Sequence, residues 1–88
     1  MYKYVIEFLA TSFLLFVIIA TGNPIYIGIA HTISVFLAKP ISGGHVSPLV
    51  SIMMVLTNKF PPDELVPYII THVLAALFVV LIYKQINL

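Results

Sequence analysis

The chain has 88 residues, of which 61% are hydrophobic and 8% are charged, and its mean hydropathy is +1.14. This composition excludes an ordinary soluble domain and is typical of an integral membrane protein. A net charge of +1 without arginine or a basic run argues against nucleic-acid binding, and the absence of cysteine excludes disulfides and thiolate metal sites. We therefore expect membrane lipid or other spans as partners, and no cofactor.

The first apolar run, residues 4–21, is long enough to cross a membrane, and Tyr2 and Tyr4 suit its interface. Glu7 lies about one turn inside this run, where an unpartnered carboxylate is costly. Two interpretations stay open at this point. Either Glu7 reaches interfacial water beside Lys3, one turn earlier, or it finds a partner inside the protein.

A Gly-Asn-Pro turn leads to a second apolar run, residues 25–38, which is short for a span. Its polar members His31 and Ser34 share a face with Ile27, and we expect that face to point inward because imidazole has no partner in lipid. A local hydrogen bond and a place on a pore wall are both open for His31. No second ligand lies at metal-binding spacing, so a metal site is rejected. Pro40 should end this helix.

The most unusual segment follows, as a polar loop over residues 39–46 and a short apolar helix over 47–57. Gly43 and Gly44 permit a tight turn, Ser47 is a good N-cap, and Pro48 suits the first helical position. The helix would rise only ~15 Å, half of a ~30 Å hydrocarbon core. A polar loop before a half-length helix is typical of a re-entrant segment, which membranes tolerate inside protein or beside a watery cavity.

A polar, proline-marked connection at a membrane surface then leads to a third span, residues 63–84, with Asp63 as the expected helix cap. Ala75 and Ala76 allow close helix contact, and His72 is predicted to satisfy its polarity inside the bundle. The predicted fold is therefore an all-α integral membrane protein. It has three transmembrane helices, a re-entrant loop and a half-helix, in a single unit over residues 1–88.

Several segments resemble one known family. Residues 42–51, S-G-G-H-V-S-P-L-V-S, resemble the S-G-x-H-x-N-P-A-V-T signature of the aquaporin and aquaglyceroporin (major intrinsic protein) family. Residues 7–11, E-F-L-A-T, are similar to the E-F-L-x-T start of the family's first helix, and residues 67–76 to the P-Y-I-x-A-Q-x-x-G-A start of its third. Family members normally carry two such units as an inverted repeat, and this chain looks like the first half.

The resemblance implies roles for particular residues. Glu7 would be buried and would brace the loop, with backbone N–H groups or His45 as its partners. Ile27 stands where the family has an aromatic residue in its narrowest constriction, so the solute size is not implied, and His31 is the second candidate for that face. The residues implied for the pore and its loop are Gly43, Gly44, His45, Ser47, Pro48 and Leu49.

Two departures bear on function. Ser47 replaces the motif asparagine and has one hydroxyl donor instead of two amide donors, and Leu49 adds bulk where the family's two half-helices meet. We predict a channel subunit for water or small neutral solutes that needs a second half, either as a homo-oligomer or with a complementary half-channel. The alternative is a non-conducting membrane scaffold in a cellular or viral membrane.

Two further classes have less support. A small oligomeric ion channel would need a ring of acids or a carbonyl filter, for which no sequence is present. An enzyme would need a nucleophile, a base and an orienting group, and these residues assemble none. For the orientation, Lys3, Lys39 and Lys59 would lie on one side of the membrane and Lys84 on the other, which predicts a cytoplasmic N-terminus.

Overall fold

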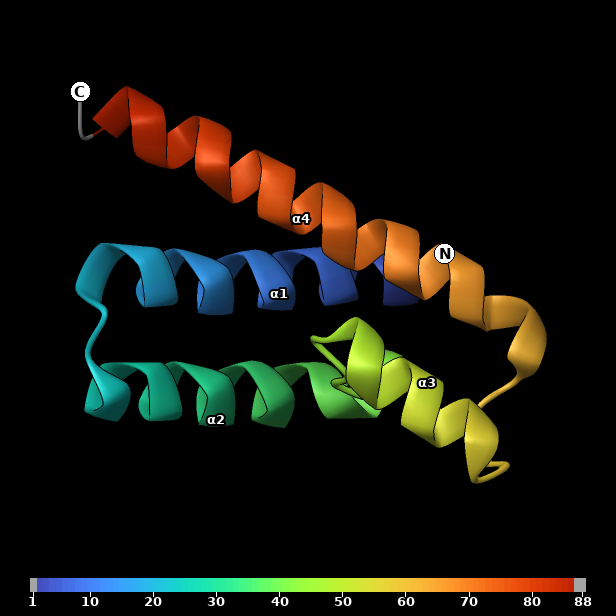
Figure 1. Cartoon of the computed structure of the whole chain (residues 1–88). Helices are drawn as coiled ribbons and strands as arrows, with labels where there is room; N and C mark the ends of the chain where they lie inside the picture. Colours follow the sequence, from blue (N-terminus) through green and yellow to red (C-terminus); the bar gives the residue numbers. More distant parts are fainter. Residues whose placement is uncertain (1, 87–88) are drawn as a thin grey trace.

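The computed structural model describes residues 2–86, and in that range the chain is helical and contains no strand (Figure 1). Its elements are α1 (Tyr2–Thr21), α2 (Pro24–Ser42), α3 (Pro48–Leu56), the 3₁₀ turn η1 (Pro62–Glu64) and α4 (Leu65–Ile86). Three segments are long and apolar enough to cross a membrane, namely α1, α2 and the joined η1 and α4. The prediction of an all-α chain with three span-length helices is confirmed.

α1 and α2 form an antiparallel pair joined by a tight turn (Figure 1). The Asn23 side chain accepts hydrogen bonds from the N–H groups of Ile25 and Tyr26, at 2.8 and 3.2 Å, and so caps α2. The buried residues of α2 are small and recur every fourth position, which lets the two helices approach closely. They are Ala30, Ser34, Ala38 and Ser42.

α2 is longer than the sequence predicts. The expected end at Ala38 is wrong, because the helix passes through Pro40 and stops at Ser42. Proline removes one helical hydrogen bond, but Gly43 N–H donates to Lys39 O at 3.0 Å and closes the last turn, where Ser42 Oγ lies 3.2 Å from Ala38 O. The expected loop over 39–46 is correspondingly shorter and covers residues 43–47.

α3 begins as its sequence predicts. Ser47 is extended, with φ of −159°, and its side chain accepts a hydrogen bond from Leu49 N–H at 3.2 Å, while Pro48 is the first helical residue. The helix ends at Leu56, so it is slightly shorter than the predicted 47–57. Figure 1 shows the chain turning back after α2, so that α3 ends at the edge of the molecule where α4 begins.

The start of the last helix differs from expectation. Asp63 does not cap it, because Pro61 occupies the cap position of η1 without a side-chain hydrogen bond and Pro62 starts the turn before Asp63 is reached. The fixed φ of consecutive prolines sets this earlier start. The acid that makes contacts is Glu64, which pairs with Lys3 and accepts a 3.3 Å hydrogen bond from the Tyr4 hydroxyl.

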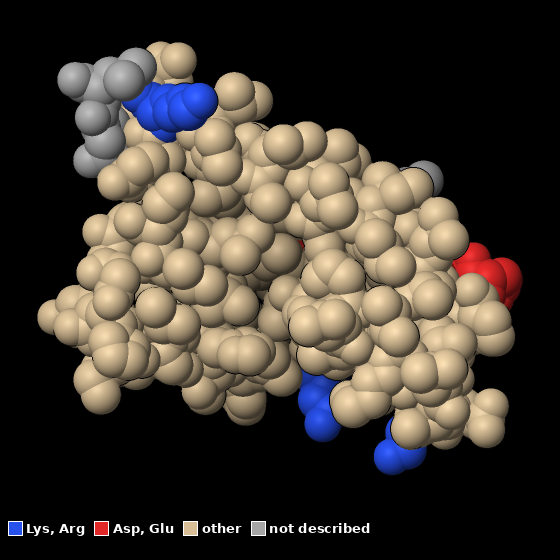
Figure 2. Space-filling model, viewed as in Figure 1, with Lys and Arg blue, Asp and Glu red and all other residues tan. Residues whose placement is uncertain are grey.

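α1 packs against both α2 and α4, and a small apolar core of Leu14, Ala30 and Val46 joins α1 and α2 to the loop. Many large apolar side chains are exposed on the three long helices. Figure 2 shows charged side chains near the margins of the visible face and mostly uncharged residues across its middle. This distribution, together with the span-length helices, marks the chain as an integral membrane protein.

Candidate functional site

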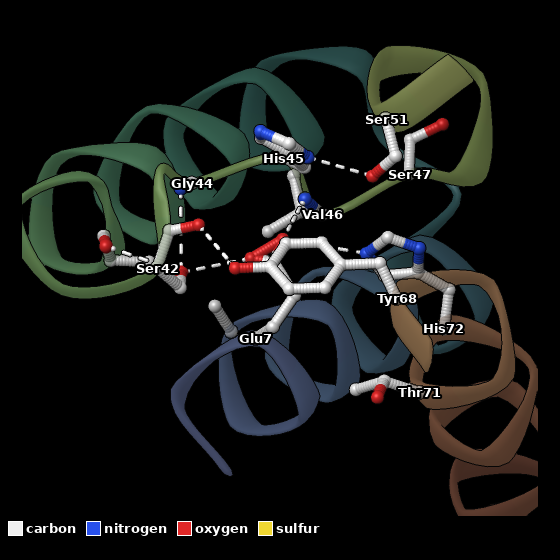
Figure 3. Close-up of polar contacts among 12 residues, drawn as sticks. Glu7, Ser42, Gly44, His45, Val46, Ser47, Ser51, Tyr68, Thr71 and His72 are labelled. Carbon is white, nitrogen blue, oxygen red and sulfur yellow. Dashed lines mark hydrogen bonds and ion pairs between the residues drawn. The ribbon is translucent and has the colours of Figure 1, made fainter. Parts of the chain in front are cut away.

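The centre of the site is the carboxylate of Glu7, which is 0% exposed. Its Oε1 accepts a hydrogen bond from Val46 N–H at 2.7 Å, and its Oε2 accepts one from Ser42 Oγ at 2.9 Å (Figure 3). His72 Nε2 lies 3.3 Å from Oε1. One side chain of α1 therefore joins the end of α2, the loop and α4.

This arrangement decides between the two interpretations of Glu7. The interfacial one is wrong, because Glu7 is buried and Lys3 pairs with Glu64. Of the two kinds of interior partner considered, a backbone N–H is present, from Val46, whereas the hydrogen bond of His45 goes to Ser51. His72 of α4 takes that place, because α4 packs beside α1 at this level while the His45 ring lies among other groups.

The loop has an unusual backbone that these bonds hold. Val46 has φ of 49°, which a β-branched residue rarely adopts and which costs about 1–3 kcal/mol. Such a conformation persists when its surroundings impose it. Here the Val46 N–H is bound by Glu7, and its side chain is buried against Leu14 and Ala30.

Gly44 is the loop position where a side chain has no room. Its φ is 64°, and an added Cβ would lie 3.1 Å from Val35 O and 3.3 Å from the Lys39 backbone. Its N–H points to Ser42 Oγ at 3.3 Å. The loop therefore packs directly on the last turns of α2, and glycine is needed both for the backbone angle and for the close approach.

His45 ties the loop to α3 and to an aromatic group. Its Nδ1 lies 2.7 Å from Ser51 Oγ, and both residues are buried. The imidazole ring also packs against Phe60 and Tyr68, with ring centroids 4.7 and 5.1 Å apart. His45 therefore acts as a packed structural side chain in this chain.

Tyr68 is a site residue to which sequence reasoning gave no role. It is 1% exposed, and its hydroxyl donates a 2.6 Å hydrogen bond to Ser42 O at the end of α2 (Figure 3). Ser42 and Ser51, the partners of Glu7 and His45, also received no role. Ser42 and Ser51 are the first and last residues of the segment that resembles the family signature, and Tyr68 lies in the resembling segment 67–76. Their positions in these motifs could have pointed to them.

The tip of α3 faces outward. Ser47 and Pro48 are half-buried, whereas Leu49 is 75% exposed. Gly43 closes α2 in a left-handed conformation, with φ of 91°. The loop residues named from the sequence are thus brought together, with the network around Glu7 on one side and the exposed tip of α3 on the other.

The predicted inward face of α2 is only partly inward. Ser34 is buried and donates to Ala10 O at 3.2 Å, and Ile27 packs against the small core. The expectation fails for His31, which is exposed. The loop packs on α2 through Val46 at Ala30 and through Gly44 near Val35 and Lys39, and His31 lies on a side of the helix that these contacts leave open. His31 borders a shallow groove along α2 with Gly28, Thr32, Val35, Phe36 and Lys39.

The described residues contain no group of three side chains that could hold a metal ion. The site is instead a hydrogen-bonded and aromatic network around Glu7, beside the start of α3. Its chemistry is that of positioning a loop and a helix N-terminus.

Comparison with curated proteins relates this arrangement to known ones. The chain is 35% identical over 86 residues to glycerol uptake facilitator protein-like 6 of Lactiplantibacillus plantarum, covering 88% of this chain and 40% of that protein. It is 40% identical over 58 residues to aquaporin AqpM of Methanothermobacter thermautotrophicus, covering 66% of this chain and 24% of that protein. The resemblance to the aquaporin and glycerol-facilitator family is confirmed.

A third relative matches over a shorter segment. The aquaglycerol porin AQY3 of Saccharomyces cerevisiae is 37% identical over 51 residues, which cover 58% of this chain and 8% of that protein. The aquaporin-like chain therefore spans two fifths or less of these curated relatives. No family model and no solved structure matches it.

Proposed function

We propose that this chain is one half-unit of an aquaporin-like channel, corresponding to the first half, and that it passes water or small neutral solutes after pairing with a second half. The observation that carries the proposal is the buried Glu7 carboxylate, which binds the Val46 N–H and so places the loop before α3. The similarity to a glycerol uptake facilitator and to aquaporins supports the solute class.

In this proposal residues 43–47 and α3 form a re-entrant segment. The nine residues of α3 rise ~13 Å, which is less than half of a ~30 Å hydrocarbon core. The N-terminus of α3 carries a partial positive charge, which repels cations. Because Ser47 Oγ accepts a hydrogen bond from Leu49 N–H, its own proton is free to point toward a passing solute.

The path itself would run beside the exposed tip of α3 and the uncovered side of α2. Ser47, Pro48 and Leu49 would lie at its middle, with the loop residues Gly43, Gly44 and His45 behind them. Ile27 and His31 would line the wall on α2. The exposure of His31 supports this, because an imidazole in a membrane is expected to face water or a partner.

A second half is proposed because the outward side of α3 is apolar and uncovered. Leu49, Met53 and Leu56 recur on one side of this helix, and each is more than half exposed. In a channel, a helix too short to cross the membrane is buried in protein or lines a cavity. The partner is a second copy or a complementary chain inserted with opposite orientation. The lysines favour a cytoplasmic N-terminus for this chain, so a second copy would have to insert against that preference, whereas a complementary chain would not.

A second candidate function is a membrane scaffold that does not conduct. The observation that favours it is the 75% exposed Leu49 at the tip of α3, where its bulk would obstruct the meeting of two half-helices. A pore of two copies would also contain no arginine. In this case the network around Glu7 stabilises the fold without forming a path.

The test is stopped-flow osmotic shrinkage of proteoliposomes that contain the purified chain, with glycerol uptake measured in parallel. We expect Ser47→Trp to abolish protein-dependent flux, because it fills the path. Leu81→Trp, at an exposed position near the far end of α4, is the matched control and should leave the flux unchanged.

Flux that survives Ser47→Trp would place Ser47 outside the path. Permeability equal to that of empty vesicles would mean that the chain does not build a path from its own copies. The same assay on vesicles with a co-purified partner would then separate the complementary-half proposal from the scaffold.

A further inference from the structure

Three buried polar atoms between the long helices have no hydrogen-bond partner among residues 2–86. They are Thr11 Oγ1, Ser12 Oγ and His72 Nδ1. The three residues are 1%, 8% and 3% exposed, respectively. Buried polar atoms in proteins are nearly always paired with protein or with ordered water, so three unpaired atoms in one region require an explanation.

Helix periodicity places the three residues at one interface, between α1 and α4. Contacts of Tyr4 with Tyr68 and of Glu7 with His72 show that the two helices run side by side in the same direction. Thr11 lies one turn beyond Glu7 on the same side of α1. Ser12 lies one turn beyond Phe8, whose ring packs against Phe78 of α4 at 5.3 Å.

A small residue faces the same interface. Ala75 lies one turn beyond His72 on α4 and is completely buried. It presents only a methyl group at the level of Thr11. The interface therefore carries buried polar groups from both helices beside a small side chain, and buried water in proteins binds such otherwise unpaired polar groups.

The chemistry of the three atoms suits water. Because the Glu7 carboxylate accepts a hydrogen bond, His72 Nε2 carries a proton, and Nδ1 can exchange a hydrogen bond with water as acceptor in the neutral ring or as donor in the protonated ring. The Thr11 and Ser12 hydroxyls both donate and accept. A water molecule can donate to Nδ1 and exchange hydrogen bonds with a hydroxyl, which gives it the two to four polar partners it needs.

We propose that ordered water occupies the α1–α4 interface between Thr11, Ser12 and His72 Nδ1. This internal hydration site extends the network by one step, from water through His72 to Glu7 and then to the Val46 N–H of the loop. The inference goes beyond the proposed function and does not depend on it, because a chain that conducts nothing has the same unpaired atoms.

The direct test is water-edited solid-state NMR of the full chain in lipid vesicles. It measures how fast magnetisation passes from water to each side chain. We expect the Thr11 and His72 signals to rise several-fold faster than those of Ala30, which is equally buried but apolar. Build-up as slow as that of Ala30 would overturn the proposal, whatever the flux assay gives.

A substitution provides a second test in which a dry and a hydrated interface give opposite signs. If water is bound, Thr11→Val removes one of its partners, and the midpoint temperature of thermal unfolding should fall by about 4–8 °C. A shift of this size accompanies a modest loss in the free energy of unfolding in a chain of this length. If the hydroxyl is unpaired and dry, the same change should leave the midpoint unchanged or raise it, and the proposal fails.

Thr32→Val is the matched control, because Thr32 is exposed and its hydroxyl donates to Gly28 O of its own helix at 2.9 Å. It should have little effect on the midpoint. The same substitution can also be made in a chain that carries His72→Leu. If Thr11 and His72 bind the same water, Thr11→Val should lower the midpoint less in that chain than in the unsubstituted one. Equal effects in both backgrounds would contradict a shared water.

Discussion

The two ends of the helix bundle are held together in different ways. At the end that carries the loop, buried polar groups from α1, α2, the loop and α4 bind one another around Glu7. At the other end, α1 and α2 meet through small and aliphatic side chains, and α4 separates from α1 toward its C-terminal end (Figure 1). Beyond Val79, no described residue of α4 is buried.

This difference shows where the precise geometry of the chain comes from. Apolar contacts are non-directional, so they leave the far ends of the helices open to lipid or to another protein. Hydrogen bonds are directional, and in an apolar interior an unmade one is costly, so the loop end has one arrangement. Substitutions at the loop end should therefore have large effects, and those at exposed positions small ones.

The largest effect is expected for Glu7→Ala. It removes the acceptor of Val46 N–H and of Ser42 Oγ and leaves His72 without its partner, so we expect a loss of about 3–5 kcal/mol in the free energy of unfolding. Reversible denaturation in detergent, followed by circular dichroism, measures it. Glu64→Ala is the control, since this acid pairs with Lys3 at the surface and should cost about 0–1 kcal/mol. Similar losses of unfolding free energy in both variants would contradict the proposed difference between the buried Glu7 and the surface Glu64.

A smaller effect is expected for Gly44→Ala. The new methyl group would require a left-handed backbone and would press on Val35 O at 3.1 Å, so we expect a loss of about 1–3 kcal/mol by the same denaturation assay. The control is Gly28→Ala, where nothing lies within 4 Å and alanine favours the helix by about 0.5–1 kcal/mol. Equal behaviour of the two variants would mean that the loop does not pack on α2 as described.

The smallest of these effects is expected for Tyr68→Phe. It keeps the aromatic packing and removes the hydrogen bond to Ser42 O, which is worth about 0.5–1.5 kcal/mol. Tyr26→Phe, at an exposed position, should change nothing measurable and serves as the control. If Tyr68→Phe were also silent, the end of α2 beyond Pro40 would not depend on α4.

Much of the fold was predictable because its signals are local. The three apolar runs gave the span-length helices, and the Ser47-Pro48 pair marked the start of α3 within one residue. Two prolines stand directly before Asp63, and they start the turn in the structure. The sequence pattern nevertheless predicts a start at Asp63, because a carboxylate is a common helix cap.

The site was predictable in part. A carboxylate inside an apolar run pointed to Glu7 as an important residue, and the glycines pointed to the loop. The partner of Glu7 on α4 lies 65 positions away, and no local pattern selects His72 over His45. The positive φ of Val46 was likewise unpredictable, because valine disfavours it and the surroundings impose it.

The sequence by itself determined that this chain is a helical membrane protein with a polar loop before a short helix, because hydrophobic length and capping act over a few neighbouring residues. The tertiary structure decided which groups bind Glu7, that α2 continues to Ser42, and that His31 is exposed. These outcomes depend on which helices lie side by side and at what level, and a buried charge takes the partners that this packing brings within reach.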